Sequence, residues 1–153
     1  MRPTDRSTEA DLSKSLDELD GIPAADLSDA PTQLVRDILR ARAKPLRDLS
    51  DSEIGKLIVQ MEGLPWLLDL VFPKLRINPL FDADYYPGDV LSNLIRAEDQ
   101  IWNDRPRYRE ELPVLYSRAL DAPFGENDGF IESLKTLPPI RIKELGLTPP
   151  LAN

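Results

Sequence analysis

The chain has 153 residues with 41% hydrophobic and 30% charged side chains, the balance of one ordinary globular domain. It contains no cysteine and no histidine, which excludes disulfides, catalytic triads and the usual zinc ligands. Its net charge of −8 opposes direct nucleic-acid binding, because affinity for phosphates comes from Lys and Arg, and favours a basic partner.

No apolar run approaches the ~20 residues that cross a bilayer, and residues 1–5 lack the apolar core of a secretory signal. We therefore expect a cytoplasmic protein without membrane contact.

Residues 1–29 are polar and acid-rich. They carry one short helical pattern at Leu12, Leu16 and Leu19, which Gly21 and Pro23 interrupt, and we interpret them as a loosely ordered arm. Pro31 then suits the first turn of a helix whose apolar stripe is expected to be buried. The stripe consists of Leu34, Val35, Ile38 and Leu39. The basic residues here are interpreted as a solvated helix face, namely Arg36, Arg40, Arg42, Lys44 and Arg47.

The clearest helix start lies at Ser50. Its side chain can cap the amide of Glu53, and Glu53 can reach back to the amide of Ser50, which is a capping box. Leu49 and Ile54 are placed to form a hydrophobic staple over it. Apolar residues continue at helical spacing to Met61, after which Gly63 is expected to stop the helix.

Apolar residues keep the same spacing from Leu64 to Leu75, although Pro73 is expected to kink or end that helix. Residues 81–86 indicate a loop leading to a new helix through Ile95, with Asp89 suited to its positive end. A further helical face runs over residues 108–119 despite Pro113, and beyond residue 123 the pattern fades.

No segment alternates in the manner of a strand. The patterns together predict an all-α fold, a compact bundle of about five to six short helices with an irregular N-terminal arm and C-terminal tail. The expected division is an arm over residues 1–29, a helical domain over 30–122 and a tail over 123–153.

The three aspartates Asp82, Asp84 and Asp89 suggest a site for a hard cation, which prefers several carboxylates from one loop. The spacing fails the calcium-loop test, because Pro87 occupies the glycine position and Asn93 the glutamate position. We predict no metal, no cofactor and no catalytic residue. A carboxylate-dependent hydrolase is the enzymatic alternative, to be tested with magnesium or manganese.

Trp66 and Trp102 are interpreted as core residues rather than partner anchors.

A set of short motifs occurs in order between Lys44 and Trp102: Lys44-Pro45-Leu46, the Leu49 to Glu53 cap, Ile58 with Gln60, Gly63-Leu64, Asn78-Pro79-Leu80, Tyr85-Tyr86-Pro87-Gly88-Asp89 and Trp102. In content and order this stretch resembles the CdiI-type immunity proteins of contact-dependent growth inhibition. The resemblance implies a non-enzymatic protein that binds and blocks the C-terminal domain of a cognate toxin. It does not imply the chemistry of the toxin, although an acidic binder would suit a basic nuclease. A general interaction adaptor unrelated to toxins is the alternative, and the neighbouring gene would distinguish the two.

The acidic loop supplies the hypothesis for the binding site. Asp82, Asp84, Tyr85, Tyr86 and Asp89 are predicted to form part of the toxin-facing surface, since carboxylates beside aromatic rings suit an interface with basic residues. The structural alternative packs both tyrosines inward and leaves Asp89 to serve only the helix start.

Overall fold

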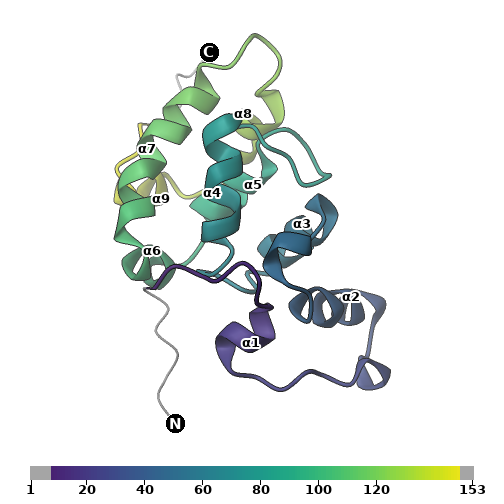
Figure 1. Cartoon of the computed structure of the whole chain (residues 1–153). Coiled ribbons are helices and arrows are strands. Elements are labelled where there is room, and N and C mark those ends of the chain that lie inside the picture. The colour runs from purple at the N-terminus through teal and green to yellow at the C-terminus, as the bar shows by residue number, and fades with distance from the viewer. Residues whose placement is uncertain (1–7, 149–153) are drawn as a thin grey trace.

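Helices alone form the regular secondary structure of residues 8–148, the part of the chain that the computed structural model describes (Figure 1). The α-helices are α1 (Leu16–Asp20), α2 (Gln33–Arg42), α3 (Asp51–Val59), α4 (Leu68–Ile77), α5 (Asp89–Ile95), α6 (Asp99–Asp104), α7 (Pro106–Leu120), α8 (Asp128–Leu134) and α9 (Pro139–Glu144). Single 3-10 turns, η1 (Leu27–Asp29) and η2 (Leu46–Asp48), precede α2 and α3. The only β pairing among these residues is an isolated bridge between Ser15 and Pro45, so the all-α prediction is confirmed.

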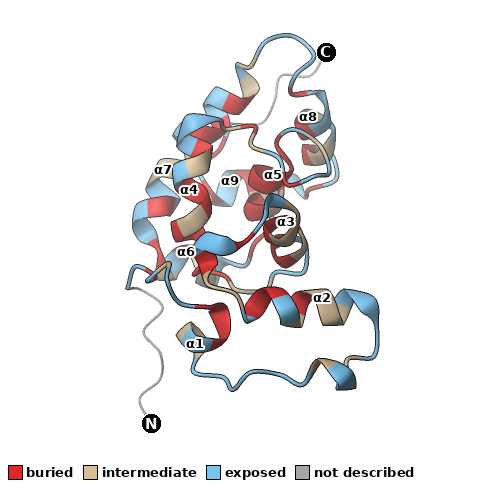
Figure 2. Ribbon diagram, turned by 45° about the vertical axis from the view of Figure 1, so that its right-hand side comes forward, coloured by how far each residue is buried: buried red, intermediate tan, exposed pale blue. Residues whose placement is uncertain are grey.

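The main helix contacts form two groups. In the first group, α2 packs on α3, α3 on α5 and α5 on α8. In the second group, α4 and α6 both pack on α7. Figure 1 shows α4 and α7 side by side in one part of the molecule, with α1 and α2 at its other end. Buried residues lie on the inward sides of these helices (Figure 2).

An aromatic cluster occupies the core between α4, α6 and α7. The ring of Phe72 stacks on that of Tyr108 at 4.3 Å and meets Trp102 edge-on at 6.3 Å. Trp102 is fully buried and Trp66 is 3% exposed, so both tryptophans are core residues as predicted. Such rings bury the largest apolar areas of any side chains, which makes this cluster a main source of stability.

A buried carboxylate joins three distant segments. Asp69 of α4 accepts hydrogen bonds from the amide of Ala10 at 2.8 Å, from Nη2 of Arg105 at 2.9 Å and from the hydroxyl of Tyr108 at 2.7 Å. The Arg105 guanidinium also lies 5.4 Å from the centroid of the Trp66 ring. The charge is therefore paired, and Asp69 ties the N-terminal segment to α4 and α7.

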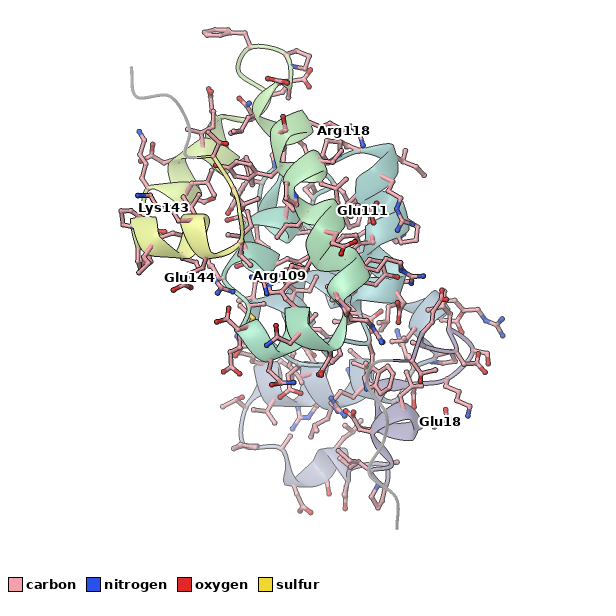
Figure 3. All side chains as sticks on the ribbon, turned by 90° about the vertical axis from the view of Figure 1, so that its left-hand side faces the viewer. Glu18, Arg109, Glu111, Arg118, Lys143 and Glu144 are labelled. Atoms are coloured by element: carbon pink, nitrogen blue, oxygen red, sulfur yellow. The ribbon has the colours of Figure 1, made fainter. Side chains whose placement is uncertain are left out.

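Further polar contacts hold the neighbours of α7 in place. Arg76 of α4 forms a bidentate ion pair with Glu111, and Nη1 of Arg118 donates to the carbonyl of Arg76 at 2.9 Å. On another side, Nη2 of Arg109 donates to the carbonyl of Glu144 in α9 at 3.0 Å. Figure 3 shows Arg109 and Glu144 meeting where α9 approaches α7.

The capping box of α3 is confirmed. The amide of Glu53 donates to Oγ of Ser50 at 3.1 Å, and the amide of Ser50 donates to Oε1 of Glu53 at 3.1 Å. The helix was expected to stop at Gly63, but α3 ends at Val59. Met61, two residues before Gly63, takes the left-handed conformation with φ of 56°, and the amide of Glu62 donates to the carbonyl of Leu57 at 2.8 Å. This pair of features closes the helix as a C-terminal cap does.

The number of helices and the two irregular ends need correction. The described residues hold nine α-helices rather than about five to six. In the arm, α1 has its own capping box at Ser15, and Leu16 is fully buried against Gly63. In the tail, α8 and α9 bury Phe130, Leu134 and Ile142. Each of these helices has five to seven residues, too few turns for a strong periodic pattern, so packing on the rest of the molecule stabilises them.

Two prolines do not end their helices. α4 begins at Leu68 rather than Leu64, and it continues through Pro73 to Ile77. Likewise α7 continues through Pro113 to Leu120. A proline inside a helix costs about 3 kcal/mol, and burial of the large apolar residues on either side outweighs that cost.

Within residues 8–148, no helix has the length and apolar character needed to cross a membrane.

Candidate functional site

The predicted site residues lie on and after the loop between α4 and α5, and the structure divides them. Asp82 and Asp84 are exposed, Tyr85 is 59% exposed and Tyr86 is half-buried. Asp89 is 1% exposed and lies beneath the loop. The first four can therefore meet a partner directly, whereas the carboxylate of Asp89 cannot in this conformation.

The side chain of Asp89 holds the loop in shape. Its two oxygens accept the amide of Ala83 at 2.9 and 3.2 Å, and Oδ2 also accepts the amide of Tyr85 at 3.0 Å. Burial raises the pKa of this carboxyl, although the hydrogen bonds from Ala83 and Tyr85 act in the opposite direction. Asp84, between these two residues, has a positive φ of 79° and is exposed. Asp89 therefore positions the exposed residues.

Two glycines allow the loop to pack against neighbouring helices. A Cβ on Gly55 of α3 would lie 2.5 Å from the carbonyl oxygen of Ala83, and one on Gly129 of α8 would lie 2.9 Å from the ring of Tyr86. Both distances are closer than real side chains approach. The loop is thus fitted to α3 and α8, and sequence reasoning did not identify either contact.

A second loop, residues 121–127 between α7 and α8, presents an aromatic ring to solvent. Phe124 is fully exposed at its tip. Nδ2 of Asn127 donates to the carbonyls of Ala119 and Leu120, both at 2.9 Å, and so caps the end of α7. The amide of Glu126 donates to the carbonyl of Pro123 at 3.0 Å. These bonds fix the loop, so Phe124 is held in an exposed position.

The segments before α5 and before α8 approach each other in two places. Tyr86 lies against Gly129 of α8, and a hollow of about 320 Å³ is lined by Asn78, Pro79, Leu80, Arg118, Asp121, Ala122, Pro123 and Glu126. We call the exposed and half-buried acidic and aromatic residues of these two loops and of the start of α8 the acidic-aromatic surface, which comprises Asp82, Asp84, Tyr85, Tyr86, Asp121, Phe124, Glu126 and Asp128. The lining of the hollow includes one basic side chain, Arg118, whose guanidinium is already bonded to the carbonyl of Arg76. Aromatic rings among carboxylates suit recognition of a basic protein surface.

The same geometry bears on the metal hypothesis. Asp89 is turned toward backbone amides and away from the exposed Asp82 and Asp84, so the three carboxylates do not converge. In the described part of the chain, no three His, Cys, Asp or Glu side chains are grouped so that they could hold a metal ion.

Comparison with known proteins gives one match. A family model described as CDI immunity proteins matches residues 18–112, which extend from α1 into α7 and include the first loop of the acidic-aromatic surface. The matched range is wider than the stretch from Lys44 to Trp102 that carries the sequence resemblance. No curated protein and no solved structure matches the chain.

Proposed function

Because the chain belongs to the family of CDI immunity proteins, we propose that it binds the C-terminal toxin domain of its cognate polymorphic toxin and thereby neutralises it. The match over residues 18–112 is the observation that carries this proposal. Neutralisation requires occupation of the toxin and no turnover, and it takes place in the cytoplasm of the cell that makes the protein. A basic nuclease is the toxin type that the net charge of −8 suits best.

The proposed toxin-binding site is the acidic-aromatic surface. Aromatic side chains are enriched at the centres of protein interfaces, and Tyr85 and Phe124 are the two exposed rings here. The surrounding carboxylates would steer a basic partner and pair with it at the rim. Asp89 contributes indirectly, because it fixes the loop that presents Asp82, Asp84 and Tyr85.

The first test is stoichiometric protection. The toxin domain encoded beside this gene is assayed with increasing amounts of the purified chain. We expect activity to reach zero near equimolar amounts, and an unrelated toxin domain to remain active. Protection by strongly sub-stoichiometric amounts would contradict the proposal and favour an enzymatic mechanism.

The second test reverses charge on the surface. The double variant Asp82→Lys and Asp84→Lys is compared with Asp48→Lys and Glu110→Lys, which changes the same charge at two exposed positions outside the surface. Affinity for the toxin domain is measured at low and high salt. The surface variant should lose the most affinity at low salt, chiefly through slower association. Equal losses in the two variants would remove the acidic loop from the interface.

A further inference from the structure

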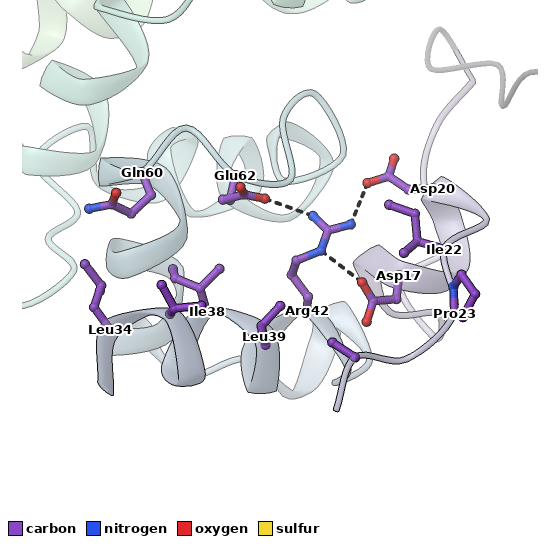
Figure 4. A pocket seen from close by; sticks show the side chains of 12 residues that line it. Asp17, Asp20, Ile22, Pro23, Leu34, Ile38, Leu39, Arg42, Gln60 and Glu62 are labelled. Atoms are coloured by element: carbon purple, nitrogen blue, oxygen red, sulfur yellow. Dashed lines mark hydrogen bonds and ion pairs between the residues drawn. The ribbon is translucent and has the colours of Figure 1, made fainter. Parts of the chain in front are cut away.

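An open groove lies along one face of α2. It has a volume of about 590 Å³, within the range of small-ligand pockets, and it runs between α2 and the extended segment 22–25 to the end of α3. Its walls are apolar and partly exposed: Ile22 is 51% and Leu34 is 44% exposed. Figure 4 shows Leu34, Ile38 and Leu39 along α2, with Ile22 and Pro23 on the opposite segment.

This open face differs from the sequence prediction. Of the four residues in the expected buried stripe, only Ile38 is buried, whereas Leu34 is exposed and Val35 and Leu39 are half-buried. The predicted solvated face is also partly wrong, because Arg42 is 7% exposed. The chain therefore leaves apolar surface uncovered on α2 while it buries a cation at the end of the same face.

Carboxylates surround that cation at the inner end of the groove. Nε of Arg42 contacts Asp17 at 2.9 Å, Nη2 contacts Asp20 at 2.8 Å and Nη1 contacts Glu62 at 3.2 Å (Figure 4). Among the described residues that line the groove, three carboxylates accompany one cation, Arg42. Ion pairs that served only to join α1 to α2 would not require the open apolar groove that leads to them.

The groove therefore combines a long apolar wall with an anionic end. We propose that it receives an arginine side chain from a protein partner, together with the apolar residue next to that arginine. The stem would lie on Leu34 and Ile38, and the guanidinium would bond Glu62, whose side chain is 44% exposed. A carboxylate can accept about four hydrogen bonds, and Arg42 uses one on Glu62.

Charge and shape together select arginine. Its stem covers apolar surface while its planar fork can bond both oxygens of a carboxylate, and the guanidinium is weakly hydrated compared with an ammonium group. Under the proposed function the partner is the toxin domain, but the chemistry of the groove does not depend on that identity.

The direct test uses short peptides rather than the toxin. The full-length ¹⁵N-labelled chain is titrated with acetyl-Leu-Arg-amide, with the lysine peptide and with the citrulline peptide, which keeps the shape of arginine without its charge. We expect saturable shifts of the amides of Leu34, Ile38 and Glu62 with the arginine peptide. The citrulline peptide should bind at least about tenfold more weakly, because its hydrogen bonds lack charge. Equal binding of citrulline, or shifts spread over the whole surface, would overturn the proposal, as would a lysine peptide that binds more tightly than arginine.

Two variants connect the peptide result to the groove. Glu62→Gln removes one charge from a side chain that is 44% exposed, and Leu34→Ser removes part of the apolar wall. Each should lower the affinity for the arginine peptide about fivefold or more, whereas Val114→Ser, at an exposed apolar position on α7, should leave that affinity unchanged. Thermal melts confirm that each variant is folded. Unchanged peptide affinity in folded Glu62→Gln and Leu34→Ser would refute the assignment.

The toxin experiment separates this proposal from the proposed function. If the peptide binds but the unmodified chain does not bind the toxin domain, the proposed function fails and the groove remains. If the toxin binds but no arginine peptide does, the groove assignment fails and the immunity function remains.

Discussion

Replacement of Asp69 by asparagine should reveal how strongly one buried carboxylate holds the fold. The change keeps the size of the side chain, so it creates no cavity, but among the described residues it removes the only ion-pair partner of Arg105. The side chain of Arg105 is 4% exposed, and its Nε and Nη1 atoms already lack a hydrogen-bond partner among the described residues. The variant therefore leaves a buried guanidinium without a counter-charge.

The structure sets the expected magnitude. Removal of one partner from a buried ion pair costs about 3–5 kcal/mol, most of it the penalty of the charge left behind. The amide of Ala10 and the hydroxyl of Tyr108 also lose a charged acceptor, which adds to the same penalty. Because a domain of this kind has a free energy of unfolding of about 5–15 kcal/mol, we expect Asp69→Asn to remove a large part of it.

Urea titration followed by circular dichroism at 222 nm measures this cost. The control is Glu110→Gln on the exposed side of α7, which should change the free energy of unfolding by less than about 0.5 kcal/mol. The double variant Asp69→Asn with Arg105→Met removes the charge as well as its partner and should recover much of the loss. A single-variant cost below about 1 kcal/mol, or strictly additive effects in the double variant, would refute the account.

A second consequence concerns Tyr108. Burial together with the hydrogen bond to Asp69 raises the pKa of Tyr108 to about 12. Without the carboxylate, the pKa should fall toward its ordinary value while burial still holds it up, and ultraviolet titration of the folded variant can follow this change.

Four further predictions concern caps, packing, pH and binding. Ser50→Ala should lower the free energy of unfolding by about 1 kcal/mol through loss of the capping box, and an unchanged urea midpoint would contradict this. Gly55→Ala should destabilise by about 1–3 kcal/mol despite its better helix propensity, because the new Cβ would clash with the backbone of Ala83, whereas a net gain would mean that the loop yields freely. Burial raises the folded-state pKa of Asp89, so its contribution to stability is fully present below pH 3.8 and is lost as the pH rises through the raised pKa. The unmodified chain should therefore lose stability relative to Asp89→Asn over that pH range, and parallel curves would disprove the shift. Phe124→Ser should leave the melting temperature nearly unchanged and weaken toxin binding by about tenfold or more, and unaltered affinity would exclude this ring from the interface.

Local signals in the sequence predicted what local interactions decide. The capping box from Ser50 to Glu53 involves four consecutive residues, so its hydrogen bonds can be inferred without knowledge of the fold. The capping box needs no contact between distant segments. The burial of Trp66 and Trp102 was indicated by the apolar residues beside them in the sequence, although distant partners such as Phe72 and Arg105 complete it.

Features that depend on distant contacts could not be predicted in this way. The helix α1 is held by Leu16 against Gly63, which lies far away in the sequence. The persistence of α4 beyond Pro73 depends on the packing of its large side chains in the core. The amphipathic pattern of α2 shows that one face is apolar, but whether anything covers that face depends on where segment 22–25 lies.

The candidate surface was predicted only in part for the same reason. The acidic loop was identified by its composition, but the inward direction of Asp89 is set by the amides of Ala83 and Tyr85 in the folded loop. Phe124 was overlooked because an aromatic residue near proline and glycine gives no local sign of its exposure.

The contacts between Arg42 and the carboxylates of α1 also have a consequence for how this protein can diversify. They hold α1 against the C-terminal end of α2, so the positions of the two helices do not depend on the length of the segment that connects them. For a flexible loop, doubling the length costs only about 0.6 kcal/mol. Insertions near Ala24 and Ala25, both exposed, would thus reshape one wall of the groove at little cost to folding. Such insertions would therefore change the shape of the open face of α2 while the helical core stays the same.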